Sequence, residues 1–130
     1  MIRYLDTSAA LKLLVQEAET DALAIQLTAW ASRGDRLVAS MLLLTELHCA
    51  ARRRRELDPH AVQAVLDAVL LVDIARDDLL RAASSAWGLR SADAIHLATA
   101  LRLDADELIA YDRELLAAAQ DAGLRTTTPG

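Results

Sequence analysis

The sequence predicts an α/β fold with a mainly parallel central sheet of four to five strands and an unusually large share of helix. Short apolar runs typical of strands alternate with longer segments of helical periodicity, as in parallel sheets that helices cover on both faces. The 130 residues fit one domain, expected over residues 1–126 with a loose tail at 127–130. Hydrophobic residues make up 54% of the chain and Phe is absent, so we expect an aliphatic core.

The first strand organises the rest of the chain. Ile2, Tyr4 and Leu5 form an apolar run that polar residues 6–8 end abruptly, and strong helix formers follow at 9–14. Further strands are expected at 36–39, 70–74, 107–111 and 124–126. Further helices are expected at 21–32, 41–56, 58–69, 77–87, 91–102 and 113–122. Ser40 and Ser91 are candidate N-caps for two of these helices.

Charge and cysteine content narrow the functional classes. The formal net charge of -5 gives no bulk attraction to nucleic acid, although a local basic patch could supply one. The lone Cys49 cannot form an internal disulfide, which fits a reducing compartment. No apolar run reaches membrane-spanning length, and a strand that begins at residue 2 leaves no room for a leader. We therefore expect a soluble cytoplasmic protein without membrane contact.

Three carboxylates are expected close to strand-to-helix transitions. Asp6 follows the first strand, Asp112 follows the fourth, and Asp93 lies in the first turn of the helix expected at 91–102. Parallel strands end at the same edge of the sheet, where open α/β folds place their sites. Each acid also has a purely structural interpretation, because Asp6 and Asp112 suit N-caps and Asp93 suits the positive end of a helix dipole.

Glu46 is the most informative acid because it lies inside a helix and has no capping role. Residues three and four apart share a helix face, which places Glu46 with the apolar residues Leu42, Leu43 and Ala50. A solvated Glu would lie on the polar face, and the alternative is a Glu that snorkels from the edge of the apolar stripe. Its helix begins near the carboxyl edge of the sheet, so Glu46 can reach the other acids.

Four acids packed together require a counter-charge, since otherwise their pKa values would rise. The only lysine is Lys12, so a hard divalent cation is the economical solution. A set of carboxylate oxygens suits Mg²⁺ or Mn²⁺ and does not suit zinc. Such an ion supports phosphodiester hydrolysis by lowering the pKa of a water molecule and stabilising charge on phosphate oxygens. Thr7 and Ser8 are expected to support an Asp6 oxygen or a metal-bound water.

Four stretches together resemble the motifs of the PIN-domain family, with the closest likeness to VapC-type toxins of prokaryotic toxin–antitoxin pairs. They are Leu5-Asp6-Thr7-Ser8-Ala9, the helix around Glu46, Ser91-Ala92-Asp93-Ala94-Ile95-His96-Leu97-Ala98, and Tyr111-Asp112-Arg113-Glu114-Leu115. The resemblance covers the whole chain and implies an α/β/α sandwich, a metal-dependent endoribonuclease, homodimerisation and inhibition by a cognate VapB-type antitoxin. It also implies that Asp6, Glu46, Asp93 and Asp112 carry the metal and the catalysis.

Other residues receive more modest interpretations. In the basic run Arg52–Arg55, Arg52 and Arg53 are candidate RNA contacts, and a solvated helix end is the alternative. His96 is interpreted as a packing or surface histidine and not as a base. An apolar helix of the antitoxin is expected to dock near Leu11, Leu14 and Trp30.

Two other functional classes fit parts of the pattern. A non-catalytic binding module could keep the same fold, although four retained acids argue against it. A phosphatase of the haloacid-dehalogenase type also begins with an acid after its first strand. It needs a second Asp two residues later, where this chain has Ser8, and a lysine further on, which this chain lacks.

Overall fold

The computed structural model describes all residues, 1–130, and contains a five-stranded, all-parallel sheet with seven helices. The strands are β1 (Ile2–Leu5), β2 (Arg36–Ser40), β3 (Leu70–Val72), β4 (Glu107–Ile109) and β5 (Arg125–Thr127). The helices are α1 (Thr7–Leu14), α2 (Thr20–Ser32), α3 (Leu42–Arg53), α4 (Pro59–Asp67), α5 (Arg76–Ser84), α6 (Ser91–Arg102) and α7 (Arg113–Asp121). The predicted α/β class and helix-covered parallel sheet are confirmed.

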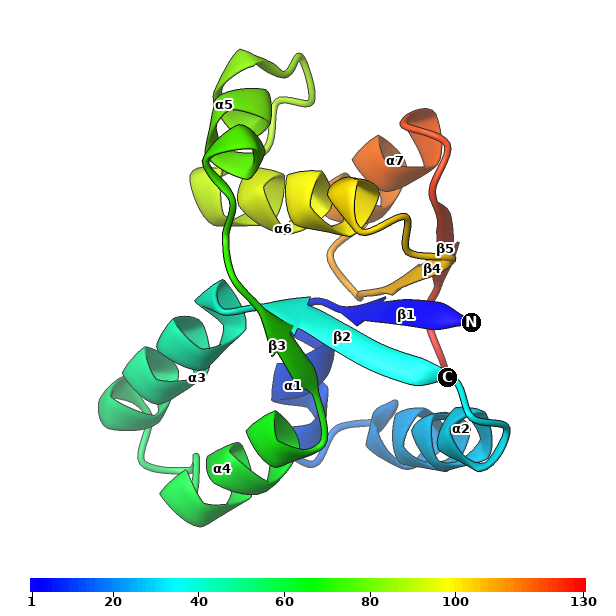
Figure 1. The fold of residues 1–130 in the computed structure, drawn as a ribbon. Helices are drawn as coiled ribbons and strands as arrows, with labels where there is room; N and C mark the ends of the chain where they lie inside the picture. Colours follow the sequence, from blue (N-terminus) through cyan, green and yellow to red (C-terminus); the bar gives the residue numbers. More distant parts are fainter.

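β1 is the central strand of the sheet, whose order is β3-β2-β1-β4-β5. Tyr4 in β1 pairs with Val38 of β2 on one side and with Leu108 of β4 on the other. Figure 1 shows α1 to α4 below the sheet and α5 to α7 above it, so both faces are covered. The strands of such a sheet are expected to be apolar throughout, and in β4 all three residues are buried.

A cluster of buried residues fills the space between the sheet and the helices, and its members are mostly Leu, Val, Ile and Ala. Tyr4 and Trp30 are its only aromatic members, so the expected aliphatic core is nearly complete. At the amino end of the sheet the buried Arg3 pairs with Asp35 and Glu107, and its guanidinium lies 3.9 Å from the centre of the Trp30 ring. No helix is both long and apolar enough to cross a membrane.

Several boundaries differ from the sequence-based expectation. The helix α3 ends at Arg53 because Arg54 takes an extended conformation, and α5 ends at Ser84 because Ser85 does the same. Ser91 is the first residue of α6 and does not cap it; Arg90 is the N-cap and forms no side-chain capping bond. β3 and β4 are shorter than expected, whereas β5 continues through Thr127, the first residue of the expected tail.

Candidate active site

The carboxyl ends of β1 and β4 lie at the topological switch point of the sheet. These strands are neighbours in the sheet, yet the helices that follow them cover opposite faces, α1 below and α7 above (Figure 1). In open α/β sheets ligands bind where the chain leaves adjacent strands in opposite directions. Asp6 is the N-cap of α1 and Asp112 is the N-cap of α7, so both expected caps exist and both lie at this switch point.

Asp6 is the most buried of the four acids, with 1% of its surface exposed. Its Oδ2 accepts hydrogen bonds from the backbone N–H of Ser8 at 3.0 Å and from the Ser8 hydroxyl at 2.6 Å. Its other oxygen, Oδ1, is the only buried side-chain nitrogen or oxygen in the chain without a hydrogen-bond partner. Buried polar atoms are normally paired, so an orphan carboxylate oxygen at a sheet switch point indicates a ligand that supplies positive charge or a proton.

Glu46 reaches this edge from the second turn of α3, and its carboxylate has polar partners. Its Oε1 accepts a hydrogen bond from the Thr7 hydroxyl at 2.8 Å and lies 2.6 Å from Nε2 of His96. Burial raises its pKa, but the His96 bond and charge and the Thr7 bond outweigh burial and hold the pKa below its usual range. The expectation that clustering raises the pKa of every acid is therefore wrong for Glu46.

Asp93 shows the opposite behaviour. Its pKa is raised to about 6, first by burial, then by the charges of Asp6 and Asp112, with a smaller contribution from Glu46 and partial relief from His96. Charges shift a pKa in this way only when they lie close to the titrating group, so Asp6, Asp112 and Glu46 are all near Asp93. The structure therefore brings together at one edge the four carboxylates that the sequence singled out.

His96 is the residue that sequence reasoning undervalued. It is fully buried in α6, and its Nδ1 lies 2.6 Å from the hydroxyl of Tyr4 in β1. Burial lowers its pKa, but the Glu46 bond and the charges of Asp6, Glu46 and Asp93 raise it further, so the net shift is upward. The available signal was spacing, because His96 follows Asp93 by three residues and so shares its face of the helix.

The donor set suits a hard cation. No group of three or more Asp, Glu, His or Cys side chains is arranged to hold a metal ion as the chain stands. Mg²⁺ keeps several waters and often uses only one or two carboxylates, so a closed protein cage is not required. Two observations fit such an ion: Oδ1 of Asp6 is buried without a hydrogen-bond partner, and the pKa of Asp93 is raised by neighbouring negative charge.

The structure places the basic run at the end of α3 and buries one of the expected docking residues. Arg52 and Arg53 are exposed in the last turn of α3, whereas Arg54 and Arg55 lie beyond its end. Arg53 follows Glu46 by two turns and so lies on the same side of α3, about 10 Å further along. Trp30 offers little surface for docking, because it is 6% exposed and its ring lies against Arg3.

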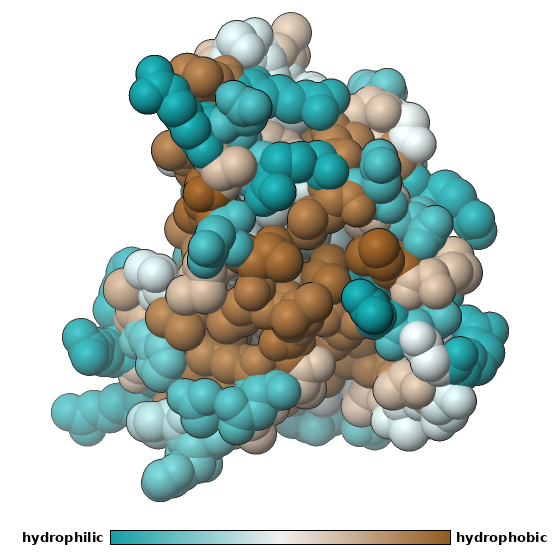
Figure 2. All heavy atoms as spheres, viewed as in Figure 1, coloured by the Kyte–Doolittle hydropathy of each residue, from teal (hydrophilic) through white to brown (hydrophobic).

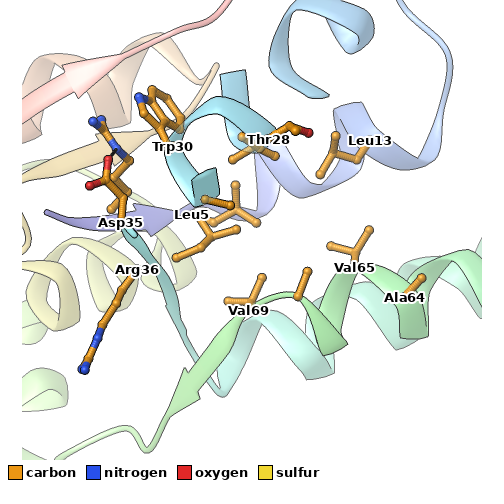
Figure 3. A pocket seen from close by; sticks show the side chains of 14 residues that line it. Leu5, Leu13, Thr28, Trp30, Asp35, Arg36, Ala64, Val65 and Val69 are labelled. Carbon is orange, nitrogen blue, oxygen red and sulfur yellow. Dashed lines mark hydrogen bonds and ion pairs between the residues drawn. The ribbon is translucent and has the colours of Figure 1, made fainter. Parts of the chain in front are cut away.

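A separate apolar groove of about 450 Å³ lies between α2 and α4, below the sheet. Figure 3 shows Leu13 of α1, Thr28 of α2, and Ala64 and Val65 of α4 around it, with Asp35 and Arg36 at one end. Figure 2 shows a broad apolar area in the middle of this face. None of the four acids lines this groove.

Comparison with known proteins is consistent with this geometry. The model of the family described as PIN domain matches residues 3–121. Ribonuclease VapC47 of Mycobacterium tuberculosis is 33% identical over 131 residues, which cover 98% of this chain and 96% of that protein. The solved VapBC2 of Rickettsia felis, bound to a DNA fragment from its promoter, covers 100% of both chains with a TM-score of 0.77 at 14% identity. VapC20 of M. tuberculosis, a sarcin–ricin loop cleaving toxin, covers 89% of this chain and 94% of that one with a TM-score of 0.67 at 19% identity.

Proposed function

The chain belongs to the PIN domain family, and we propose that it is a metal-dependent endoribonuclease that acts as the toxin of a toxin–antitoxin pair. Relatives that carry the name ribonuclease align over nearly their full length, which supports the nuclease activity. Two solved structures with the same fold contain toxin–antitoxin pairs, which supports an antitoxin partner. Family membership and the missing second Asp at Ser8 both disfavour the phosphatase alternative.

The observation that carries the proposal is the buried, unpaired Oδ1 of Asp6 within a cluster of four carboxylates. Asp6, Asp93, Glu46 and Asp112 would hold Mg²⁺, with Mn²⁺ as a substitute, because both ions prefer oxygen ligands. A divalent cation there would supply a water of lowered pKa and positive charge beside the scissile phosphodiester.

The remaining steps belong to the chain itself. Ser8 holds one oxygen of Asp6 through two hydrogen bonds, which leaves the other oxygen free. Thr7 holds Oε1 of Glu46, and Asp112 is fixed by the backbone N–H of Leu115, which donates to its side chain at 3.0 Å. The pKa of Asp93 is raised to about 6 by burial and by its acidic neighbours, so its ionised form is less favoured than that of an ordinary Asp, and positive charge nearby would favour it. The rim, defined as the edge of the sheet that carries Asp6, Glu46, Asp93 and Asp112, is thus arranged to attract a cation and to orient carboxylates around it.

The proposed antitoxin partner fits the apolar groove between α2 and α4. Ten of the fourteen lining residues are hydrophobic, which suits the apolar face of an amphipathic helix. The half-buried Asp35 and the exposed Arg36 at one end offer charged groups that can fix its direction. The surface expected from the sequence overlaps this groove only in part: Trp30 lines the groove but is 6% exposed, whereas Leu11 and Leu14 do not line it.

RNA cleavage with and without metal tests the activity. The purified chain is expected to cut labelled total RNA with Mg²⁺ or Mn²⁺ and to lose this activity in EDTA or on Asp6→Asn substitution. Undiminished cleavage in EDTA would rule out the metal mechanism. Failure of the folded wild-type chain to cut RNA or bind Mn²⁺ would favour the alternative, a non-catalytic binding module. Light scattering of the purified chain tests the homodimer that the resemblance implies.

A further inference from the structure

A chain of buried hydrogen bonds connects the backbone of β2 to the carboxylate of Glu46. The backbone N–H of Ser40 donates to the Tyr4 hydroxyl at 3.0 Å. The Tyr4 hydroxyl lies 2.6 Å from Nδ1 of His96, and Nε2 of His96 lies 2.6 Å from Oε1 of Glu46. The Thr7 hydroxyl donates to the same oxygen at 2.8 Å. Five elements, β2, β1, α6, α3 and α1, therefore meet on this one line of contacts.

The direction of each hydrogen bond follows from the chemistry of the groups. A backbone N–H can only donate, so the Tyr4 oxygen accepts from Ser40 and its own hydrogen is available to Nδ1 of His96. An ionised carboxylate can only accept, so Nε2 of His96 carries a hydrogen. When His96 is neutral, an imidazole protonated at Nε2 lets every group in the chain form its hydrogen bond. The hydroxyl of Tyr4 thus selects the tautomer of His96.

We propose that His96 is a positioning residue that, with its tautomer fixed by Tyr4, holds the Glu46 carboxylate in the orientation the site requires. His96 is fully buried, so it has no surface to offer an RNA substrate and can act only through Glu46. Oε1 of Glu46 receives both His96 and Thr7, whereas its Oε2 forms no hydrogen bond within the chain. The hydrogen bonds from His96 and Thr7 therefore occupy Oε1 and leave Oε2 available at the rim, where the Glu46 side chain is 28% exposed.

The geometry separates this role from ordinary packing. Groups behind a ligand that fix its tautomer or rotamer change metal affinity or activity when they are removed. Thr99 offers a matched comparison, since it is one turn further along α6, fully buried, and bonded to Asp78 and to the Ile95 carbonyl. Its bonds tie α6 to α5 and do not involve the four acids. Substitution of either Thr99 or His96 should therefore lower stability through the loss of a buried hydrogen bond. Only substitution of His96 should also lower kcat and Mn²⁺ affinity through the loss of positioning.

The inference rests on the proposed metal-dependent nuclease function, and four variants test it. In His96→Gln the side-chain amide can reach the Nε2 position and still donate to Glu46, whereas His96→Ala removes the donor. Tyr4→Phe removes only the hydroxyl that selects the tautomer. Thr99→Val is the control. Measurements on each are kcat and KM with a short labelled RNA, Mn²⁺ affinity by calorimetry, and the tautomer of His96 by ¹⁵N NMR of the imidazole.

His96→Ala is expected to lower kcat and weaken Mn²⁺ binding by roughly 10–100-fold with KM little changed, and His96→Gln to recover most of this loss. At a pH high enough for His96 to be neutral, wild type should show the Nε2–H tautomer, and Tyr4→Phe should shift the Nδ1 resonance and lower kcat. Thr99→Val should lower the melting temperature and leave kcat and Mn²⁺ affinity unchanged. If His96→Ala does not fold, the Tyr4→Phe and His96→Gln results decide the question.

Wild-type kcat and Mn²⁺ affinity in Tyr4→Phe and in folded His96→Ala, or an Nδ1–H tautomer in wild type, would overturn the positioning role. Asp6→Asn distinguishes this from failure of the proposed function. If Asp6→Asn abolishes cleavage while the His96 and Tyr4 variants keep it, only the positioning role is wrong. If the wild-type chain neither binds Mn²⁺ nor cuts RNA, the proposed function itself fails.

Discussion

The Ser8 hydroxyl accepts a hydrogen bond from the backbone N–H of Tyr111 at 2.9 Å, although the two residues are 103 positions apart. The same hydroxyl donates to Oδ2 of Asp6 at 2.6 Å. Ser8 therefore ties the start of α1 to the segment between β4 and Asp112. It sets the spacing of two candidate ligands that arrive from different strands.

Ser8→Ala should consequently impair the site more than the fold. Each lost hydrogen bond costs about 1 kcal/mol of unfolding free energy, while loss of support behind a ligand lowers activity roughly 10–100-fold. RNA cleavage rates and urea unfolding measure the two effects. Ser84→Ala is the control, because its exposed hydroxyl donates only to carbonyl groups of its own helix and forms no hydrogen bond with the four acids. Equal activity of the two variants would contradict a role for Ser8 at the rim.

The raised pKa of Asp93 predicts a pH-dependent stability. With a native pKa of about 6 against an ordinary value of 3.8, the native state binds this proton more tightly than the unfolded state does. Ionised Asp93 therefore destabilises the metal-free protein; this penalty is absent below the ordinary pKa of 3.8, grows as the pH rises toward 6 and is complete above it. In EDTA, the melting temperature of Asp93→Asn minus that of wild type should increase between pH 4 and pH 7.

Asp77 is the matched control for Asp93, since it is an exposed acid in the first turn of α5. Its substitution by Asn removes the same favourable helix-dipole contact without touching the cluster. A melting-temperature difference for Asp93→Asn that is constant with pH, or that follows Asp77→Asn, would show that Asp93 is only a helix-end residue.

Arg53 should contribute to RNA affinity through phosphate contact. It lies two turns beyond Glu46 on the same side of α3, and the chain as a whole is acidic, so any attraction to RNA must be local. In an Asp6→Asn background, which prevents cleavage, Arg53→Ala should weaken RNA binding and reduce the slope of log affinity against log salt by about 1. Arg54→Ala is the control, because Arg54 lies beyond the helix and pairs with Glu56. Identical salt slopes for both variants would exclude Arg53 from the RNA interface.

The groove between α2 and α4 makes a prediction about the antitoxin. Ala64 is exposed and lines the groove, so Ala64→Glu places a charge where an apolar helix is expected to lie, at little risk to folding. Co-purification with a co-expressed VapB-type antitoxin that binds the wild-type chain should be lost in this variant. Ile25→Glu should leave it intact, because Ile25 is 71% exposed on α2 and does not line the groove. Retention of the partner by Ala64→Glu would place the interface elsewhere.

The sequence was sufficient for the fold class and for the position of the acids. Alternating apolar runs predict parallel strands, parallel strands end at one edge, and Asp6 and Asp112 follow strand ends directly. The sequence did not allow prediction of hydrogen bonds between side chains that are distant in the chain. Tyr4 and His96 are 92 positions apart, and nothing local in either stretch indicates that β1 and α6 place them in contact. The C-terminal limit of α3 was missed for a similar reason, since Arg54 continues the helical pattern but takes an extended conformation.

The sign of the Glu46→Gln effect distinguishes the sequence-based hypothesis from the structure. Reasoning from clustered acids alone predicts that removing one charge stabilises the metal-free protein. In the structure, however, Glu46 accepts two hydrogen bonds and its pKa is lowered, so ionised Glu46 stabilises the native state above its ordinary pKa of 4.5. Its contribution is lost as the pH falls through the native pKa. Among the charges that raise the pKa of Asp93, that of Glu46 contributes least, so its removal relieves little repulsion.

Glu46→Gln should therefore lower the melting temperature in EDTA at pH 7. Gln can still accept from His96 and Thr7, but neutral hydrogen bonds are weaker than charged ones, by about 1 kcal/mol in total. The difference from wild type should shrink as the pH falls below the ordinary pKa of 4.5 and through the lowered native pKa of Glu46, where Glu46 itself becomes protonated. Glu56→Gln, at an exposed pair with Arg54, should show no comparable change. A higher melting temperature for Glu46→Gln at pH 7 would mean that repulsion among the acids outweighs the His96 and Thr7 contacts.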